Sequence, residues 1–330
     1  MRIRRLLRAF WLLVPVLALA AAGGAAAQQR FPDRPVRLVV PAAPGSSPDA
    51  LGRMMSTRLA ETWGQPLVVE NVLGAGGVIG HDRAAKSKPD GYTLLMGLFG
   101  PMSVSKSLGE KLPYDPATDF APVTLLVSLP NLLAVHPGVP AHNLAELLAY
   151  ARQNPGKLRF GFPGEGTSSH LSSELLNEMA GIRIVGVPYK SSAQMVTDLI
   201  GGHIEMLFLP VPQLLPHVRS GALRAIAVSA RERSASALDI PTLHESGLPG
   251  YDIAPWFALY APAGTPDAVV RKLNADVAAV FSQREVVSWL SAQAFTSGIG
   301  SPEALSAYQA AEEAKWRRLA AVIRARSAAK

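Results

Sequence analysis

Four short loops in the sequence combine residue types that could hold a small anion. They occupy residues 44–47, 74–77, 164–169 and 190–192, consist mostly of small residues, and each opens a predicted helix. The first turn of a helix carries amides without partners and about half a positive charge, and small residues let an anion reach the backbone. Ordinary helix capping explains any one of them. Four such loops at the carboxyl ends of strands predict a crevice that binds a small anion with few charged side chains.

The enzyme motifs that would give these loops another role are not met. Residues 74–80 space their glycines one position away from the G-x-G-x-x-G dinucleotide fingerprint, and residues 161–166 begin like a P-loop but lack its lysine. The sequence has no G-x-S-x-G elbow and no H-E-x-x-H pair. His170 and Glu174 share a helix face and could ligate a metal, but a capped helix with a surface polar pair explains them as well. We therefore expect neither a metal nor a cofactor.

The elements that would position the loops follow a βαβα rhythm. Short apolar runs alternate with amphipathic segments, which predicts an α/β fold with parallel sheets and helices on both faces. One helix should follow the N-cap Ser47, with Pro48 at its first position, and end at Gly64; the final pair should follow the N-caps Thr265 and Ser301. The predicted strands span residues 36–40, 67–69, 92–96, 159–162, 182–187, 204–209 and 222–228. The helix after the strand at 159–162 should end at Gly181, and the helix after the strand at 182–187 at Gly201 or Gly202.

The composition and the first residues are those of a folded, exported protein. Of 330 residues, 48% are hydrophobic and 17% charged, which excludes extended disorder and favours two domains. The absence of cysteine excludes disulfides, thiolate metal sites and a lipidated cysteine. Four arginines in residues 1–8 precede an apolar run over residues 9–22 and three alanines at 25–27. This pattern predicts a signal peptide, residues 1–27, because the run is shorter than the roughly 20 residues that span a bilayer. We expect the mature protein in the periplasm, and the choice between the Sec and twin-arginine routes stays open.

Cleavage would change the charge of the protein. Four arginines and no acidic residue leave with the signal, so the formal net charge falls from +7 to +3. Six of the remaining basic residues lie between Lys315 and Lys330. A cluster confined to the end of the chain predicts a solvated helix face and tail, because nucleic-acid binding needs a broader patch with stacking aromatics. We expect no nucleic-acid partner.

The loops are also where the chain resembles a known family. Residues 31–41 read Phe-Pro-Asp-Arg-Pro-Val-Arg-Leu-Val-Val-Pro, an Ala-Pro-Gly follows at 43–45, and residues 70–95 contain Glu-Asn, Gly-Ala-Gly-Gly and Pro-Asp-Gly-Tyr-Thr-Leu-Leu. From residue 30 to 320 the chain is similar to the solute receptors of tripartite tricarboxylate transporters, the Bug family of periplasmic binding proteins. Further matches, in order, are Gly-Thr-Ser-Ser-His at 166–170, Val-Pro-Tyr-Lys at 187–190, Asp-Leu at 198–199, Leu-Arg-Ala at 223–225, Pro-Thr at 241–242, Gly-Leu-Pro-Gly-Tyr at 247–251 and Ala-Pro-Ala-Gly-Thr-Pro at 261–266.

The resemblance implies a two-lobed periplasmic binding protein fold of type II, a Venus flytrap that closes about a hinge. Lobe 1 would comprise residues 28–130 and 251–330, and lobe 2 residues 131–250. Family receptors hold a carboxylate through backbone amides and small hydroxyls of the first two loops and a distal group through the other two, while Asp49 should position its helix. The implied ligand-binding residues are Ala43, Gly45, Ser46, Ser47, Gly76, Gly77, Val78, Gly166, Thr167, Ser168, His170, Pro188, Tyr189 and Lys190.

Five positions depart from what is usual in the family. An aromatic residue is usual at Ala42, a glycine at Ser46 and at Ser191, a polar residue at Val78 and an aspartate at Leu209. These changes enlarge one wall of the implied site and remove a carboxylate that could pair with a ligand ammonium group. A larger or less polar carboxylate is therefore expected rather than an amino acid.

The resemblance implies a function without catalysis. The protein would be a monomeric receptor that binds a di- or tricarboxylate or a related acid and passes it to membrane transporter subunits by transient contact. Two alternatives stay open. One is an exported α/β hydrolase or transferase that uses a Ser or Thr with His170, and the other is an orphan receptor that feeds a sensor.

Overall fold

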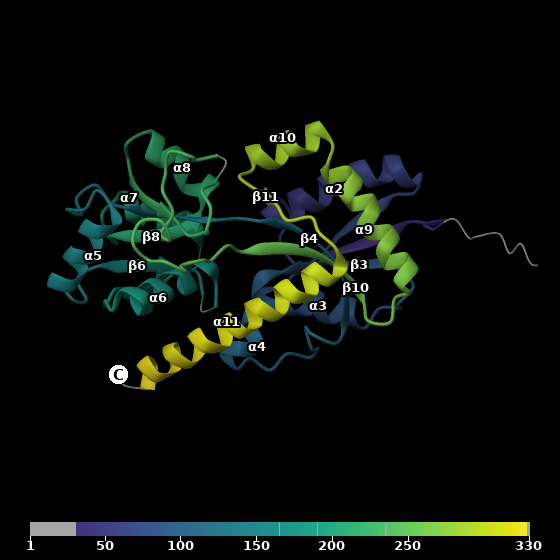
Figure 1. The fold of residues 1–330 in the computed structure, drawn as a ribbon, viewed down its shortest axis with the longest axis horizontal. Helices are drawn as coiled ribbons and strands as arrows, with labels where there is room; N and C mark the ends of the chain where they lie inside the picture. The colour runs from purple at the N-terminus through teal and green to yellow at the C-terminus, as the bar shows by residue number, and fades with distance from the viewer. Residues whose placement is uncertain (1–30, 165, 190, 235, 329–330) are drawn as a thin grey trace, which may run out of the picture.

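The structure is a computed structural model that describes residues 31–328, except residues 165, 190 and 235, with side chains up to residue 321. The predicted signal peptide, residues 1–27, lies outside the described residues. Figure 1 shows two α/β lobes side by side, each built around one sheet. The fold is therefore the two-lobed α/β architecture that the sequence predicts, while the residue boundaries of the lobes stay a prediction.

The larger sheet belongs to lobe 1 and has six strands. They are β1 (Val36–Val40), β2 (Leu67–Asn71), β3 (Thr93–Leu98), β4 (Phe120–Ser128), β10 (Trp256–Pro262) and β11 (Thr296–Ser297). Their order across the sheet is β11-β4-β10-β3-β1-β2. β1 pairs in parallel with β2 and β3, whereas β10 is antiparallel to both β3 and β4.

The smaller sheet belongs to lobe 2 and has five strands. They are β5 (Asn131–Val135), β6 (Arg159–Phe162), β7 (Val185–Pro188), β8 (Met206–Pro210) and β9 (Arg224–Val228). Their order is β7-β6-β8-β5-β9. β6 pairs in parallel with β7 and β8, and β5 is antiparallel to β8 and β9.

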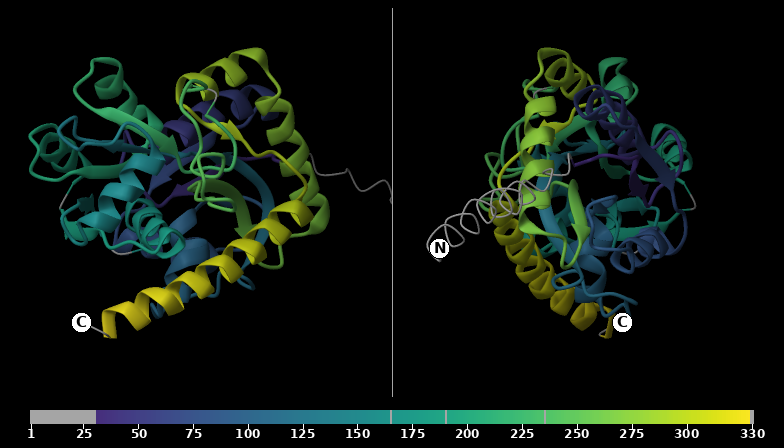
Figure 2. Two further views of the ribbon diagram at one scale, coloured as in Figure 1. Left: turned by 60° about the vertical axis from the view of Figure 1, so that its left-hand side comes forward. Right: turned by 90° about the vertical axis from the view of Figure 1, so that its right-hand side faces the viewer.

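Helices cover both faces of each sheet (Figures 1 and 2), as the sequence predicts. They are α2 (Ser47–Trp63), α3 (Val78–Ala85), α4 (Ser105–Leu108), α5 (Leu144–Gln153), α6 (Ser168–Ala180), α7 (Ser192–Ile200), α8 (Val211–Arg219), α9 (Asp267–Phe281), α10 (Arg284–Ala292) and α11 (Pro302–Ala328), with a 3-10 turn η1 (Ala75–Gly77) and a π turn η2 (Gly100–Val104). On the larger sheet α2, α9 and α10 pack on one face and α3, η2 and α11 on the other. On the smaller sheet α7 and α8 face α5 and α6 across the strands. Among the described residues, no helix is both long enough and apolar enough to cross a membrane.

The buried core continues from one lobe into the other. Alternate residues of β1 point to opposite faces, so Leu38 packs under α2 and Val39 packs on the α3 side. Val39 belongs to the same buried cluster as Leu133 and Phe160 of the smaller sheet. We call the boundary between the lobes, where this shared cluster lies, the seam. Helix α11 lies along the seam, and its Trp316 is fully buried there. The lobes are therefore held together by apolar packing as well as by the chain.

Both sheets are mixed, so the expectation of parallel sheets is wrong in one respect. β4 runs parallel to β1–β3, and the chain then crosses from its end at Ser128 to the start of β5 at Asn131. The return crossing leads to Trp256, the first residue of β10, which pairs with Ser128. Because β5 and β10 enter their lobes from the crossing, they run opposite to the strands that end there. The carboxyl ends of β1–β3 and of β6–β8 consequently face the same crossing.

A buried serine joins the two crossings, residues 129–130 and 253–255, which we call the hinge. Ser229 Oγ accepts a hydrogen bond from Asn131 N (2.9 Å) and donates one to Ile253 O (2.5 Å). Its backbone exchanges bonds with the same two residues, at 2.8 Å each. Leu129 N also donates to Pro255 O at 2.7 Å. The two chain segments that connect the lobes are thus fixed to each other.

Two predicted helix starts are wrong by one residue. Ser46, rather than Ser47, is the extended N-cap of α2, so Pro48 takes the second helical position. Pro266, rather than Thr265, is the N-cap of α9, because Thr265 donates its hydroxyl to Pro262 O at 2.8 Å and closes a turn instead. The predicted N-cap Ser301 is confirmed, since its hydroxyl accepts a bond from Ala304 N.

Five of the seven predicted strands, β2, β3, β7, β8 and β9, differ in extent from the prediction. β7 begins at Val185 and not at residue 182, because the Asn177 side-chain amide bonds both the N–H and the carbonyl of Ile184 in place of a neighbouring strand. The separate helix α10 makes the final group three helices instead of two. The predicted helix ends are confirmed: Gly64 and Gly181 are both left-handed C-caps.

We predict that Ser229→Ala lowers the free energy of unfolding by about 1 to 3 kcal/mol, because it leaves a buried N–H and a buried carbonyl without partners. Urea denaturation measures the difference. Ser220→Ala is the control, since Ser220 is an exposed serine at the end of α8 whose hydroxyl also donates to a backbone carbonyl. It should change the free energy by less than about 0.5 kcal/mol. Equal losses in both variants would contradict the hinge role.

Candidate functional site

The first predicted loop, between β1 and α2, is closed by its own hydrogen bonds. Gly45 adopts φ +80° and donates its N–H to Asp49 Oδ2 at 2.8 Å. Ser46 donates both its N–H and its hydroxyl to Ala43 O. Ala43, Gly45 and Ser47 are exposed at the surface of the loop. The hydroxyl of Ser46 is therefore engaged within the loop, and the first-turn amides of α2 are the donors that a ligand could meet.

Asp49, in the first turn of α2, holds this loop, whereas the resemblance implies only that it positions its helix. Its carboxylate is 2% exposed and accepts bonds from Gly45 N, from Arg53 Nε (2.9 Å) and from Asn71 Nδ2 (2.9 Å). Asn71 Nδ2 also bonds Ala42 O at 3.0 Å. The bond from Arg53 lowers the pKa of Asp49 from 3.8 to about 2; burial opposes this shift, and the bonds from Gly45 and Asn71 add to it. The network fixes the loop after β1 to the end of β2.

The second loop turns on glycines in the left-handed region. Gly76 adopts φ +63° and Gly77, the N-cap of α3, adopts φ +103°. Gly77 N donates to Gly74 O at 2.9 Å, and Gly77 is buried so tightly that a Cβ there would lie 3.2 Å from Pro41 O. Val78 begins α3 and is half-buried. The amides at the start of α3 follow directly from this turn.

The third loop, between β6 and α6, is closed by the hydroxyl of Thr167. Thr167 is the N-cap of α6, but its hydroxyl makes no capping bond and donates to Gly164 O at 2.7 Å. Gly166, at φ +73°, donates its N–H to His170 Nδ1 at 3.4 Å. Ser168 is half-buried at the first position of α6. The hydroxyl proton of Thr167 is thus committed to the loop.

The remaining predicted residues of lobe 2 border this loop. The ring of His170 is buried and lies 4.8 Å from that of Phe162. Pro188 ends β7 and is exposed, and the next residue, Tyr189, donates its N–H to Phe162 O and its hydroxyl to Asp198 Oδ2 at 2.8 Å. Burial, followed by that bond to Asp198, raises the pKa of Tyr189 to about 12. The predicted residue Lys190 lies outside the described residues.

Strand direction and one contact bring the loops of the two lobes to a common region. All four follow strands whose carboxyl ends face the hinge. A Cβ placed on Gly166 would lie 2.8 Å from Leu108 Cδ1, so the third loop rests against α4 of lobe 1. The predicted loops therefore follow strand ends that face the hinge, and the third loop contacts lobe 1.

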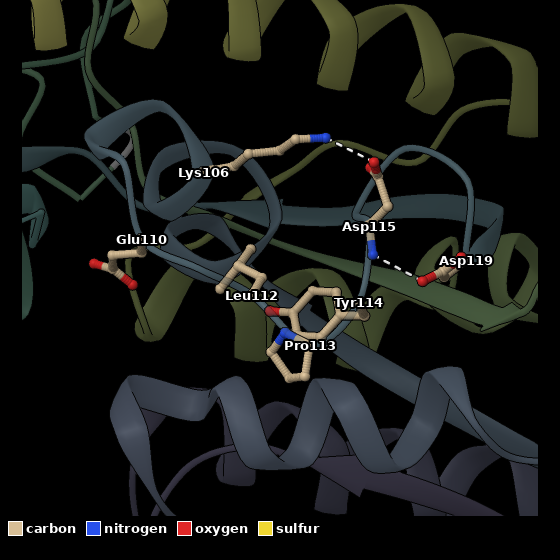
Figure 3. Close-up of a pocket in the computed structure, with 7 residues that line it drawn as sticks. All are labelled: Lys106, Glu110, Leu112, Pro113, Tyr114, Asp115 and Asp119. Atoms are coloured by element: carbon tan, nitrogen blue, oxygen red, sulfur yellow. Dashed lines mark hydrogen bonds and ion pairs between the residues drawn. The ribbon is translucent and has the colours of Figure 1, made fainter.

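A separate surface cavity, of about 430 Å³, contains none of the predicted residues (Figure 3). Its charged lining residues are Glu110, Asp115, Asp119 and Lys106, and the lysine is paired with Asp115 at 2.7 Å. An anion would meet three carboxylates there, so this cavity does not suit the ligand class that the loops predict.

The partners of Asp49 are not among the residues predicted from the sequence. Arg53 lies four residues after Asp49 on α2. Opposite charges at this spacing on a helix can pair, so the sequence alone indicates this ion pair. Asn71 stands in a family motif, but its contact with Asp49 joins residues 22 positions apart, which no local pattern shows. Within the described residues, no group of three or more His, Asp or Glu side chains is arranged to hold a metal ion.

Comparisons with known proteins agree on one family. Residues 51–326 match the model of the tripartite tricarboxylate transporter family receptor. The chain is 35% identical over 317 residues to protein BugT of Bordetella pertussis, covering 96% of each chain. It is similar to the structure of R. palustris Rpa4515 with adipate (38% identity, TM-score 0.77, covering 88% of this chain and 97% of that one). It is also similar to MatC (Rpa3494) from Rhodopseudomonas palustris with bound malate (33% identity, TM-score 0.74, covering 88% and 100%).

We predict that Asp49→Asn flattens the acid dependence of stability. A carboxyl whose pKa is lowered by folding stabilises the protein above 3.8 and loses that contribution as the pH falls toward 2, here roughly 2 kcal/mol. The difference in unfolding free energy between about pH 5 and pH 3 should therefore shrink in the variant, as urea denaturation can measure.

The matched control is Asp267→Asn. Asp267 also pairs with an arginine four residues on, Arg271, at the start of a helix, but its side chain is 74% exposed. This variant should keep the wild-type difference. If both variants behave alike, the burial of Asp49 is not what matters.

Proposed function

The chain belongs to the tripartite tricarboxylate transporter receptor family, and we propose on that premise that it is a periplasmic receptor for a small organic carboxylate. The receptor binds the acid between its lobes and delivers it to membrane transporter subunits by transient contact. Two relatives of known structure support the ligand class, because one was determined with adipate and the other with malate.

One observation carries the proposal: loops from two different sheets present helix starts to the same seam. The first-turn amides of α2, α3 and α6 have no acceptors inside their own helices and point beyond the helix ends. The described loops bring no basic side chain among the predicted residues, apart from the ring of His170. Backbone donors and the positive ends of helices suit a carboxylate, which they can bind without an ion pair.

The residues that we propose for ligand binding divide between the lobes. Lobe 1 supplies the loops at residues 43–47 and 76–78, and lobe 2 those at residues 166–170 and 188–190. Because Thr167 and Ser46 donate their hydroxyls internally, neither brings a hydroxyl donor to a carboxylate, and the backbone supplies the donors. Asp49 holds the loop at residues 43–47 in place and does not contact the ligand. Its charge is paired with that of Arg53.

The interior of lobe 2 supports an acid without an ammonium group. Leu209 is buried on β8 in the same apolar cluster as Leu132 and Leu214, and the partly buried Tyr189 packs against this cluster. An aspartate at this position could pair with a ligand ammonium, whereas leucine offers only apolar surface. We therefore favour a dicarboxylate or a less polar acid over an amino acid.

The remaining parts of the proposal concern export and organisation. Residues 1–27 form a cleaved signal peptide that directs the receptor to the periplasm. The mature receptor is a monomer. Residues 28–130 and 251–330 form lobe 1, and residues 131–250 form lobe 2. The positions of the two sheets and of the hinge support this division.

A hydrolase or transferase is not favoured. Such an enzyme would need a hydroxyl bonded to His170 as nucleophile and base. Thr167 donates its hydroxyl to Gly164 O instead, and the nitrogen Nδ1 of His170 accepts a bond from Gly166 N. A receptor that feeds a sensor would share the same binding step and differ only in its partner.

We predict that at least one acid in a panel of mono-, di- and tricarboxylates, adipate and malate included, raises the melting temperature of the protein. Binding to the folded state alone stabilises it by about 2.7 kcal/mol at a concentration a hundredfold above Kd. Differential scanning fluorimetry measures the shift, with the matching amides and alcohols as controls. A panel in which only neutral or cationic compounds act would show that the site is not built for carboxylates.

We also predict that the bound acid draws the lobes together and is not consumed. Its full set of hydrogen bonds exists only when both lobes contact it, and this difference in affinity shifts the hinge equilibrium. Small-angle scattering should give a smaller radius of gyration at saturation, and chromatography should recover the acid unchanged after long incubation. Conversion that scales with protein concentration and disappears in His170→Ala would instead support an enzyme.

A further inference from the structure

His81 is a fully buried histidine behind the second ligand loop. It lies on the inward face of α3, where its Nδ1 is 2.8 Å from Gly77 O and its Nε2 is 3.1 Å from Leu98 N. A backbone N–H can only donate, so Nε2 must offer its lone pair to Leu98. Nδ1 must then carry the hydrogen and donate it to Gly77 O. Only the neutral ring with its hydrogen on Nδ1 satisfies both bonds.

The two bonds connect parts of the structure that no other described side chain joins in this way. Gly77 completes the turn of the ligand loop, and Leu98 is the last residue of β3. A Cβ on Gly77 would lie 3.3 Å from Leu98 Cδ1, so the loop and the strand end are already in close contact. A shift of Gly77 would therefore move the first-turn amides of α3, which begin at the next residue.

The surroundings of the ring decide how it responds to pH. The ring of Tyr114 stacks on it at 5.8 Å, from the segment that also lines the cavity in Figure 3. Asp82 and Arg83 follow it on α3, Glu110 precedes Tyr114 on the neighbouring segment, and Tyr260 on β10 belongs to the same buried cluster as Tyr114. Burial lowers the pKa of His81 to about 4, and the bond to Gly77 opposes this only in part.

We propose that His81 is a positioning residue for the ligand loop at residues 74–78, holding it in the binding geometry through its neutral ring. This inference rests on the proposed function, because it assigns His81 to the same site. Protonation would place a hydrogen on Nε2 opposite the Leu98 N–H, so that two donors face each other and the hydrogen bond between His81 and Leu98 is lost. Carboxylate affinity then depends on the neutral form of a residue that does not touch the ligand.

Two substitutions separate positioning from simple packing. His81→Gln keeps one donor and one acceptor in a side chain that does not titrate, and His81→Phe keeps an aromatic ring but neither bond. The control is His217→Gln on α8, which is half-buried on the opposite lobe. Amide hydrogen exchange at residues 74–80 reports the loop without any ligand. Exchange there should rise at least tenfold in His81→Phe and stay within threefold of wild type in the other two variants.

Isothermal titration with adipate then tests the consequence for binding. At pH 7 the affinity should fall at least tenfold in His81→Phe and stay near wild type in His81→Gln. Near pH 4 about half of the wild-type rings are protonated, so wild type should bind about twofold more weakly than His81→Gln. Comparing these two proteins at the same pH cancels the protonation of adipate itself.

Each outcome bears on one proposal. Unchanged loop exchange in a folded His81→Phe variant would overturn the positioning role, whatever the protein binds. If His81→Phe does not fold, equal pH dependence of loop exchange in wild type and His81→Gln would overturn it. Failure of wild type to bind any carboxylate of the panel would contradict the proposed function alone, and the exchange measurements would still decide the role of His81.

Discussion

A strand that enters a lobe at the hinge must run away from it, and the arrangement of the candidate site depends on this constraint. β5 starts at Asn131 and β10 at Trp256, immediately after the two crossings, and both run antiparallel to their neighbours. The strands with the opposite direction therefore end at the hinge, in both lobes. The loops before α2, α3 and α6 therefore follow strand ends that face the hinge. Ser229 then fixes the two crossings to each other through bonds to Asn131 and Ile253.

The electrostatics of the seam follow from where the charges are placed. The carboxylate of Asp49 lies under the first loop and is neutralised by Arg53, so it organises the loop without repelling an anion. The hydroxyl of Thr167 is directed into its own loop, and that of Tyr189 is directed to Asp198. The hydrogen-bond donors that these loops leave for a ligand are mostly backbone amides. Such donors favour a carboxylate over a neutral group, but they distinguish poorly between acids.

The sequence predicts the fold class and most elements because local signals specify them. Gly64 and Gly181 end helices in the left-handed conformation, which glycine adopts without strain, and the strand at residues 159–162 has the predicted bounds. The antiparallel strands β5 and β10 were not predicted, because the strand–helix alternation that indicates parallel pairing does not extend to strands that follow a crossing between the lobes. The hydroxyl of Thr167 had two acceptable uses, capping or turn closure, and only the path of residues 164–166 decides between them. The ring of His81 connects Gly77 to Leu98 through two hydrogen bonds, a pairing that no spacing in the sequence shows.

The central claim is that loops of both lobes hold one carboxylate ligand at the seam. A crystal structure of the mature protein with adipate would test this most directly. We expect one carboxylate of adipate within about 3 Å of first-turn amides of α2 or α3, and the remainder of the molecule in contact with the loops before α6 and α7. Adipate bound to one lobe only, or bound in the acidic cavity at Lys106 and Asp119, would contradict it.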